Sequence, residues 1–101
     1  MKFRFTAVAE KDLFEIWAFI ASRNRSAADK MERQILEACL RLAERPDLGH
    51  SRRDLTARDL RFFNVRGFCL IVYELESNPL SVLRVLHGAR AARVELKSEI
   101  H

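Results

Sequence analysis

The chain has 101 residues, of which 49% are apolar and 32% are charged, and this composition is typical of one globular domain rather than of a disordered chain. No apolar run approaches the ~18 residues that a transmembrane helix needs, and the alternating N-terminus lacks the cleavage site of a signal peptide. The net charge is +4 and 14 of the 18 basic residues are arginine, so the partner could be nucleic acid or an acidic protein surface, since guanidinium binds phosphate and carboxylate alike.

The chain begins with a predicted strand and a predicted helix. Residues 2–6 alternate polar and aromatic side chains, which places Phe3 and Phe5 on one face of a short strand. Residues 7–22 have apolar side chains at the i, i+3, i+4 and i+7 positions of one helical stripe, which are Leu13, Ile16, Trp17 and Ile20.

A second helix is predicted over residues 27–43. Ser26, with Asp29 three residues later, resembles a capping box at its start, and Pro46 follows its end. Because only a few residues join the two helices, we expect them to form an antiparallel hairpin.

The second half of the chain predicts three strands. A loop over 46–57 is followed by strands over 58–65, 68–75 and 80–87, and a short terminal helix is predicted over 91–100. Short turns between consecutive strands indicate an antiparallel meander, and the helical hairpin would cover one face of it. The expected fold is therefore α+β, a single domain with the order β-α-α-β-β-β and a small, mainly antiparallel sheet.

The strand over 68–75 is apolar on both faces. Such a strand requires cover on both sides, and the helical hairpin supplies only one cover. The other cover could be a partner chain, a second copy, a ligand, or the loop and tail of the chain itself.

The two cysteines, Cys39 and Cys69, each lie inside an apolar segment. We interpret them as buried, reduced thiols, which fits a cytoplasmic protein. Because the spacing of four metal ligands is absent, we expect no metal and no cofactor.

Four segments resemble the ParE-type toxins of the RelE/ParE superfamily, which come from bacterial type II toxin–antitoxin systems. The most specific features are the Pro-Asp-Leu-Gly ending after the second helix and the His-Gly-Ala-Arg ending of the last strand. Together the segments span about residues 2–92, and they are Asp12–Ala21, Ile35–Gly49, Leu60–Val65 and Val82–Arg90.

The resemblance implies a cytoplasmic toxin that a cognate, ParD-like antitoxin neutralises by laying a flexible segment on it. ParE-type toxins are plasmid-stabilisation proteins that inhibit DNA gyrase by binding, so no residue would be catalytic. The RelE-type relatives instead cut messenger RNA on the ribosome, and this chain could also be a degenerate toxin that only binds its antitoxin.

In the ribonuclease alternative, His87 would be the general base, and Arg61 and Arg84 would hold the phosphate. Arg84 and His87 are three residues apart, so a regular strand directs them to opposite faces. An arginine in mid-strand also needs a partner, and a salt bridge or an antitoxin contact is a simpler role for Arg84 than catalysis. The cluster of Lys, Glu and terminal Tyr found in RelE-type enzymes is absent. The strand parity and this absence both favour binding over catalysis.

The candidate contact residues for an antitoxin or target are basic side chains of the central loop and the last strands. Those in the loop could equally be a solvated surface, and whether the chain binds nucleic acid directly is open. The candidates are Arg52, Arg53, Arg61, Arg84, His87 and Arg90.

Overall fold

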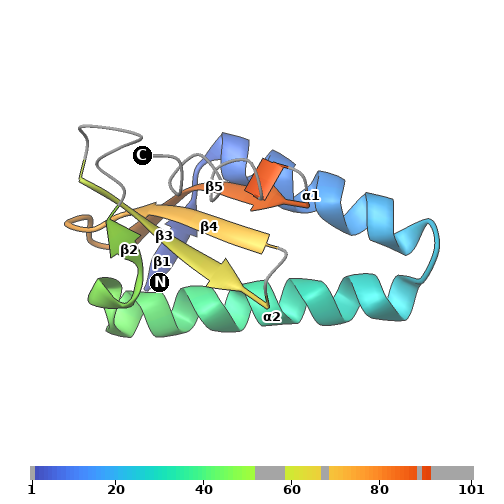
Figure 1. The fold of residues 1–101 in the computed structure, drawn as a ribbon, viewed down its shortest axis with the longest axis horizontal. Coiled ribbons are helices and arrows are strands. Elements are labelled where there is room, and N and C mark those ends of the chain that lie inside the picture. Colours follow the sequence, from blue (N-terminus) through green and yellow to red (C-terminus); the bar gives the residue numbers. More distant parts are fainter. Residues whose placement is uncertain (1, 52–58, 67–68, 89, 92–101) are drawn as a thin grey trace, which may run out of the picture.

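In the computed structural model, which describes residues 2–51, 59–66, 69–88 and 90–91, a helical hairpin packs on one face of a five-stranded sheet (Figure 1). The α+β class and the order of elements are therefore as expected. In chain order the elements are β1 (Phe3–Phe5), α1 (Ala7–Ala21), α2 (Arg25–Glu44), the 3-10 helix η1 (Pro46–Leu48), β2 (His50–Ser51), β3 (Leu60–Val65), β4 (Cys69–Glu74) and β5 (Leu80–His87).

The strand order in the sheet is β1-β5-β4-β3-β2. The predicted meander is confirmed, because β3 pairs antiparallel with β4 and β4 pairs antiparallel with β5. The first strand, β1, lies parallel to β5 at one edge, and the two-residue β2 lies antiparallel to β3 at the other. The helical hairpin is thus part of the long connection that separates the parallel pair.

The segment predicted as a loop over 46–57 is partly regular. The 3-10 helix η1 and the strand β2 occupy its first half, and residues 52–58 lie outside the described part of the chain. Apart from Ala91, the predicted helix over 91–100 also lies outside the described residues.

The start of α1 is fixed by Thr6. Its hydroxyl oxygen accepts a hydrogen bond from the Ala9 N–H (3.1 Å), which caps the helix, and the same hydroxyl donates to the Leu83 carbonyl (3.0 Å). One side chain therefore caps α1 and attaches it to β5.

The start of α2 differs from the prediction. The cap is Asn24, whose side-chain oxygen accepts from the Ala27 N–H at 3.0 Å, and the helix begins at Arg25. The predicted capping box of Ser26 and Asp29 is wrong, because Asp29 instead accepts a hydrogen bond from Trp17 Nε1 (2.9 Å) across the hairpin.

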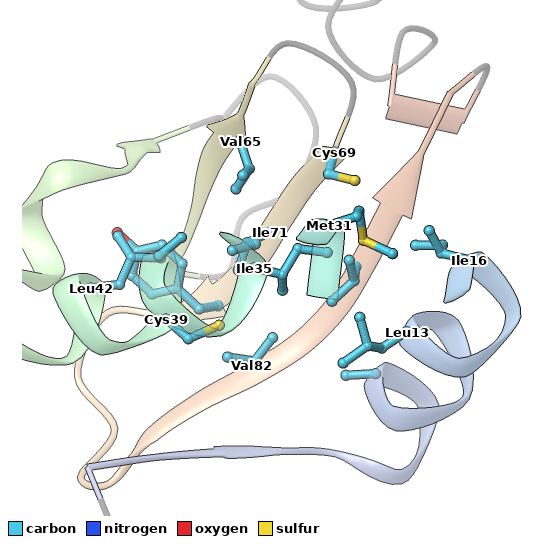
Figure 2. Close-up of a cluster of buried hydrophobic side chains, with 14 of the residues drawn as sticks. Leu13, Ile16, Met31, Ile35, Cys39, Leu42, Val65, Cys69, Ile71 and Val82 are labelled. Carbon is cyan, nitrogen blue, oxygen red and sulfur yellow. The ribbon is translucent and has the colours of Figure 1, made fainter. Parts of the chain in front are cut away.

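The main core lies between the hairpin and the sheet. Figure 2 shows side chains of α2 among residues of the sheet and of α1, with Ile35 and Cys39 near the centre. The buried apolar stripe of α2 consists of Ala28, Met31, Ile35, Ala38, Cys39 and Leu42, and all of these except Ala28 belong to this core. This burial supplies most of the stability of a hairpin whose helices have mixed propensities.

The opposite face of β4 carries Leu70 and Val72. Both are buried, and they form a smaller cluster with Phe62 and Ala91. Since both faces of β4 are already buried within the chain, this strand gives no argument for a partner on its second face.

Candidate functional site

The strand β5 contains a bulge that decides where its polar residues point. Val72 of β4 lies opposite Arg84, whereas the next residue, Tyr73, lies opposite Val82, so β5 has one extra residue, Leu83, at this point. As a result Val82 and Val85, three residues apart, both belong to the main core.

After the bulge β5 is regular. Arg84 pairs with Val72 of the smaller cluster, and His87 pairs with Cys69 of the main core. The two side chains therefore leave the strand on opposite faces, in agreement with the prediction from strand parity.

The partner of Arg84 is Asp12 of α1. Its carboxylate accepts from Arg84 Nε at 2.7 Å and from Arg84 Nη2 at 3.0 Å, which is a bidentate pair, and it also accepts from the Val85 backbone N–H at 3.0 Å. The side chain of Asp12 is 7% exposed and that of Arg84 is 41% exposed. The hydrogen bond to Asp12 raises the pKa of the Arg84 guanidinium, so Arg84 is charged at every physiological pH.

Thr6 and Asp12, from the start of α1, cover the edge of β5 beyond the end of β1. The Val82 carbonyl accepts from the Thr6 N–H, the Leu83 carbonyl accepts from the Thr6 hydroxyl, and the Val85 N–H donates to Asp12. The start of α1 thus satisfies the backbone groups that a longer β1 would have paired, as buried backbone groups require.

His87 and Arg90 lie at an open hollow beside this pair, between α1 and the end of β5. Its volume is about 210 Å³, and it is lined by Asp12, Glu15, Ile16, Phe19, Val85, His87 and Arg90. His87 and Arg90 therefore share the hollow with Asp12, the partner of Arg84, whereas Arg84 itself is not among the lining residues.

Arg61 lies elsewhere. It lies opposite Tyr73 of β4, whereas His87 lies opposite Cys69 of the same strand. Tyr73 and Cys69 are four residues apart, which corresponds to about 13 Å along the strand. Arg61 Nη1 donates to the Gly49 carbonyl (3.3 Å), and its buried Nε has no hydrogen-bond partner among the described residues. Arg61 is therefore not part of the cluster around Arg84.

The hydroxyl of Tyr73 fastens the turn after α2. It accepts from the Gly49 N–H (2.9 Å) and donates to the Pro46 carbonyl. A Cβ atom on residue 49 would meet this hydroxyl and the adjoining ring carbons, which explains why the Pro-Asp-Leu-Gly segment ends in glycine. Burial raises the pKa of Tyr73.

Asp12 and Tyr73 make polar contacts around the site that the sequence interpretation missed. Asp12 shares the buried face of α1 with Ala9, Leu13 and Ile16. A carboxylate on a buried apolar stripe signals a fixed partner, because an unpaired buried charge is costly.

The loop candidates Arg52 and Arg53 lie outside the described residues, and His50 before them is exposed on the edge strand β2.

Among the described residues, no group of three His, Cys, Asp or Glu side chains could hold a metal ion. Burial raises the pKa of the Cys39 thiol to about 12 and that of Cys69 to about 11, so both are protonated at neutral pH. In the described part of the chain, neither helix is long and apolar enough to cross a membrane.

Comparison with known proteins gives two findings. The family model described as "ParE toxin of type II toxin-antitoxin system, parDE" matches residues 3–92. A solved structure titled "Chromosomal ParDE TA system from P. aeruginosa" has a chain with the same fold, at a TM-score of 0.69 and 18% identity, with 87% of this chain and 96% of that chain covered. No curated protein sequence matches.

Proposed function

The chain belongs to the ParE toxin family of type II toxin–antitoxin systems, and on this premise we propose that it inhibits a target protein by binding and is neutralised by a cognate antitoxin. By resemblance to the family, the target is DNA gyrase in the cytoplasm and the antitoxin is ParD-like. The proposal assigns no catalytic residue to the chain.

The observation that carries this proposal is the separation of the three residues that RNA cleavage would require. A metal-free ribonuclease needs a base, an acid and cations around one phosphate. Here Arg61 lies beside Gly49, whereas Arg84 is paired with Asp12 and leaves β5 on the face opposite to His87. This arrangement favours binding over catalysis.

We propose that the antitoxin contacts the hollow at the end of β5 through an acidic or apolar segment. Arg90 lines the hollow and is exposed, so a carboxylate can reach it, and Phe19 supplies an apolar wall that is 56% exposed. Charge-assisted hydrogen bonds to arginine together with apolar contacts would give both register and affinity.

The decisive experiment is induced expression of the chain, with plasmid supercoiling and cleavage of translated messages measured in the same cultures. We expect growth arrest, a change in supercoiling and intact messages, and purified chain should inhibit gyrase-catalysed supercoiling. Cut messages with unchanged supercoiling would overturn the proposal in favour of the ribonuclease.

The contact residues are tested with Arg90→Ala and His87→Ala, each with and without a co-expressed antitoxin. We expect both variants to bind the antitoxin more weakly, while Lys11→Ala, on the exposed surface of α1, serves as the matched control. If the wild-type chain neither arrests growth nor inhibits gyrase-catalysed supercoiling but still binds the antitoxin, the chain is a degenerate toxin. The inhibitory part of the proposal then fails.

A further inference from the structure

The two helices form a second hollow on the other flank of α1, away from the hollow at β5. Only residues of α1 and α2 line it, and its volume is about 360 Å³. We call it the hairpin groove, and its residues are Glu10, Leu13, Phe14, Trp17, Asp29 and Glu32.

A stacked aromatic pair forms one wall of the hairpin groove. The rings of Phe14 and Trp17 are stacked, with centroids 6.5 Å apart and an interplanar angle of 24°. The indole is held by its hydrogen bond to Asp29, yet Phe14 remains 67% exposed. Because the indole is held in place and the neighbouring ring is exposed, the pair has the character of an anchor at a protein interface.

The charge of the hairpin groove is opposite to that of the chain. Three of its six lining residues are acidic and none is basic, whereas the chain has a net charge of +4. Carboxylates repel phosphate, so this groove does not suit nucleic acid or an anionic membrane, and it attracts cations.

The hairpin itself shows which cation its aromatic rings accept. The guanidinium of Arg25 lies 5.8 Å from the centre of the Trp17 ring, and that of Arg23 lies 5.0 Å from the Phe19 ring. Guanidinium stacks on aromatic faces and binds carboxylates through two hydrogen bonds, which ammonium does less well.

We infer that the hairpin groove docks an arginine-bearing peptide segment of another protein. The arginine lies on the exposed ring of Phe14 between the carboxylates of Glu10 and Glu32, and an apolar neighbour in the segment contacts Leu13. This contact is separate from the proposed antitoxin contact at Arg90 and His87, because the two hollows share no residue.

The test uses Trp17, the only tryptophan of the chain, as its reporter. A short peptide of alternating arginine and leucine is titrated into the purified chain, and the indole emission is followed. We expect a saturable change that weakens as salt is raised, is smaller for the lysine peptide and is absent for the neutral citrulline peptide. A response to citrulline equal to that to arginine would overturn the inference.

Variants locate the binding. Glu10→Gln combined with Glu32→Gln should raise the Kd about fivefold, and Phe14→Ala should do so by a similar factor. The matched control is Glu37→Gln, an exposed α2 carboxylate outside the groove, which should leave the Kd unchanged. Circular dichroism verifies that each variant is folded.

Equal effects of the groove and control variants would contradict the inference, since they would indicate general charge attraction. An emission change that depends on protein concentration without peptide would also overturn it, because a second copy would then be the occupant. None of these readouts depends on toxicity or on gyrase, so the inference and the proposed function can fail separately.

Discussion

At the scale of single residues, Asp12 has the largest role. One carboxylate accepts from two nitrogens of Arg84 and from the backbone of Val85, at distances of 2.7 to 3.0 Å. Hydrogen bonds to a charged group contribute more than neutral ones, and leaving their buried donors unpaired costs more still. Asp12 therefore joins α1 to the last strand through chemistry that hydrophobic contacts do not supply.

Asp12→Asn should lower the free energy of unfolding by about 2 kcal/mol, because the amide lacks the charge and turns a donor toward Arg84 or Val85. Urea denaturation measures this loss. The control is Lys11→Ala, which removes the exposed Lys11–Glu15 pair (4.0 Å) and should cost less than about 0.5 kcal/mol. Equal losses in the two variants would show that the Asp12 network does not stabilise the fold.

Gly49 and Tyr73 form the second decisive residue pair. Gly49→Ala places a methyl group against the Tyr73 hydroxyl and should cost about 1–3 kcal/mol through overpacking. Tyr73→Phe leaves the Gly49 N–H and the Pro46 carbonyl without their partner and should cost a similar amount.

The double variant of Gly49 and Tyr73 tests whether these two effects have one origin. Because Tyr73→Phe removes the nearest of the atoms that the new methyl group meets, the double variant should lose less stability than the sum of the single losses. Thermal or urea unfolding of the four proteins gives the coupling, and additive losses would contradict this explanation of the glycine.

At the scale of elements, the ends of helices were harder to predict than their apolar faces. The stripe from Met31 to Leu42 identified α2 directly, since burial on a 3.6-residue period needs no knowledge of tertiary contacts. Its first residue depended on which of two neighbouring polar side chains, Asn24 or Ser26, turned back to the helix. Asp29, the second residue of the predicted capping box, accepts a hydrogen bond from Trp17 instead of capping the helix.

Substitution of the two candidate caps separates them. Asn24→Ala should lower the free energy of unfolding by about 1 kcal/mol, because the Ala27 N–H loses its acceptor. Ser26→Ala, inside the first turn of α2, should change it by less than about 0.5 kcal/mol. Chemical denaturation measures both, and the prediction is wrong if Ser26→Ala is the costlier change.

The bulge in β5 is the element-scale feature that no residue pattern announced. Alternation along Leu80 to His87 is consistent with a regular strand, and the extra residue at Leu83 is visible only from the pairing with β4. The sequence did predict that Arg84 and His87 leave on opposite faces, because the strand is regular between them.

At the scale of the whole molecule, the class and the chain order of the elements followed from periodicity, but the strand order in the sheet did not. Nothing in Phe3 to Phe5 indicates which strand it pairs with, and its parallel pairing with Leu80 to Val82 is a tertiary outcome. The same holds for the site. The sequence predicts that Arg84 has a partner, but the partner is Asp12, 72 residues away, and only the tertiary fold identifies it.

Buried acids give the whole molecule a predictable response to alkali. In the unfolded chain both thiols ionise near an ordinary pKa of 9.0, whereas in the fold Cys69 holds its proton to about 11 and Cys39 to about 12. Because the pKa values of the thiols are higher in the fold, their contribution to stability is fully present below about pH 9. This contribution is lost as the pH rises toward 12. Tyr73, whose pKa is also raised, acts in the same direction.

The expected slope between pH 9 and 11 is about 1.4 kcal/mol per pH unit for each thiol. Denaturation midpoints measured through this range test it, with Cys39→Ala and Cys69→Ala as variants. Each variant should be less stable at pH 7 but have a shallower slope, and an unchanged slope in both would contradict the role of the thiols.

The edge formed by β1, Thr6 and β5 has a consequence for biosynthesis. Thr6 is made well before its partner Leu83, which follows it by 77 residues. Because such distant contacts must wait for β5, the pairing of β1 and the Asp12–Arg84 pair cannot form on a nascent polypeptide that stops before it. A translation product interrupted before Leu83 therefore lacks its closing edge, and the toxin domain reaches its native form only after β5 has been made.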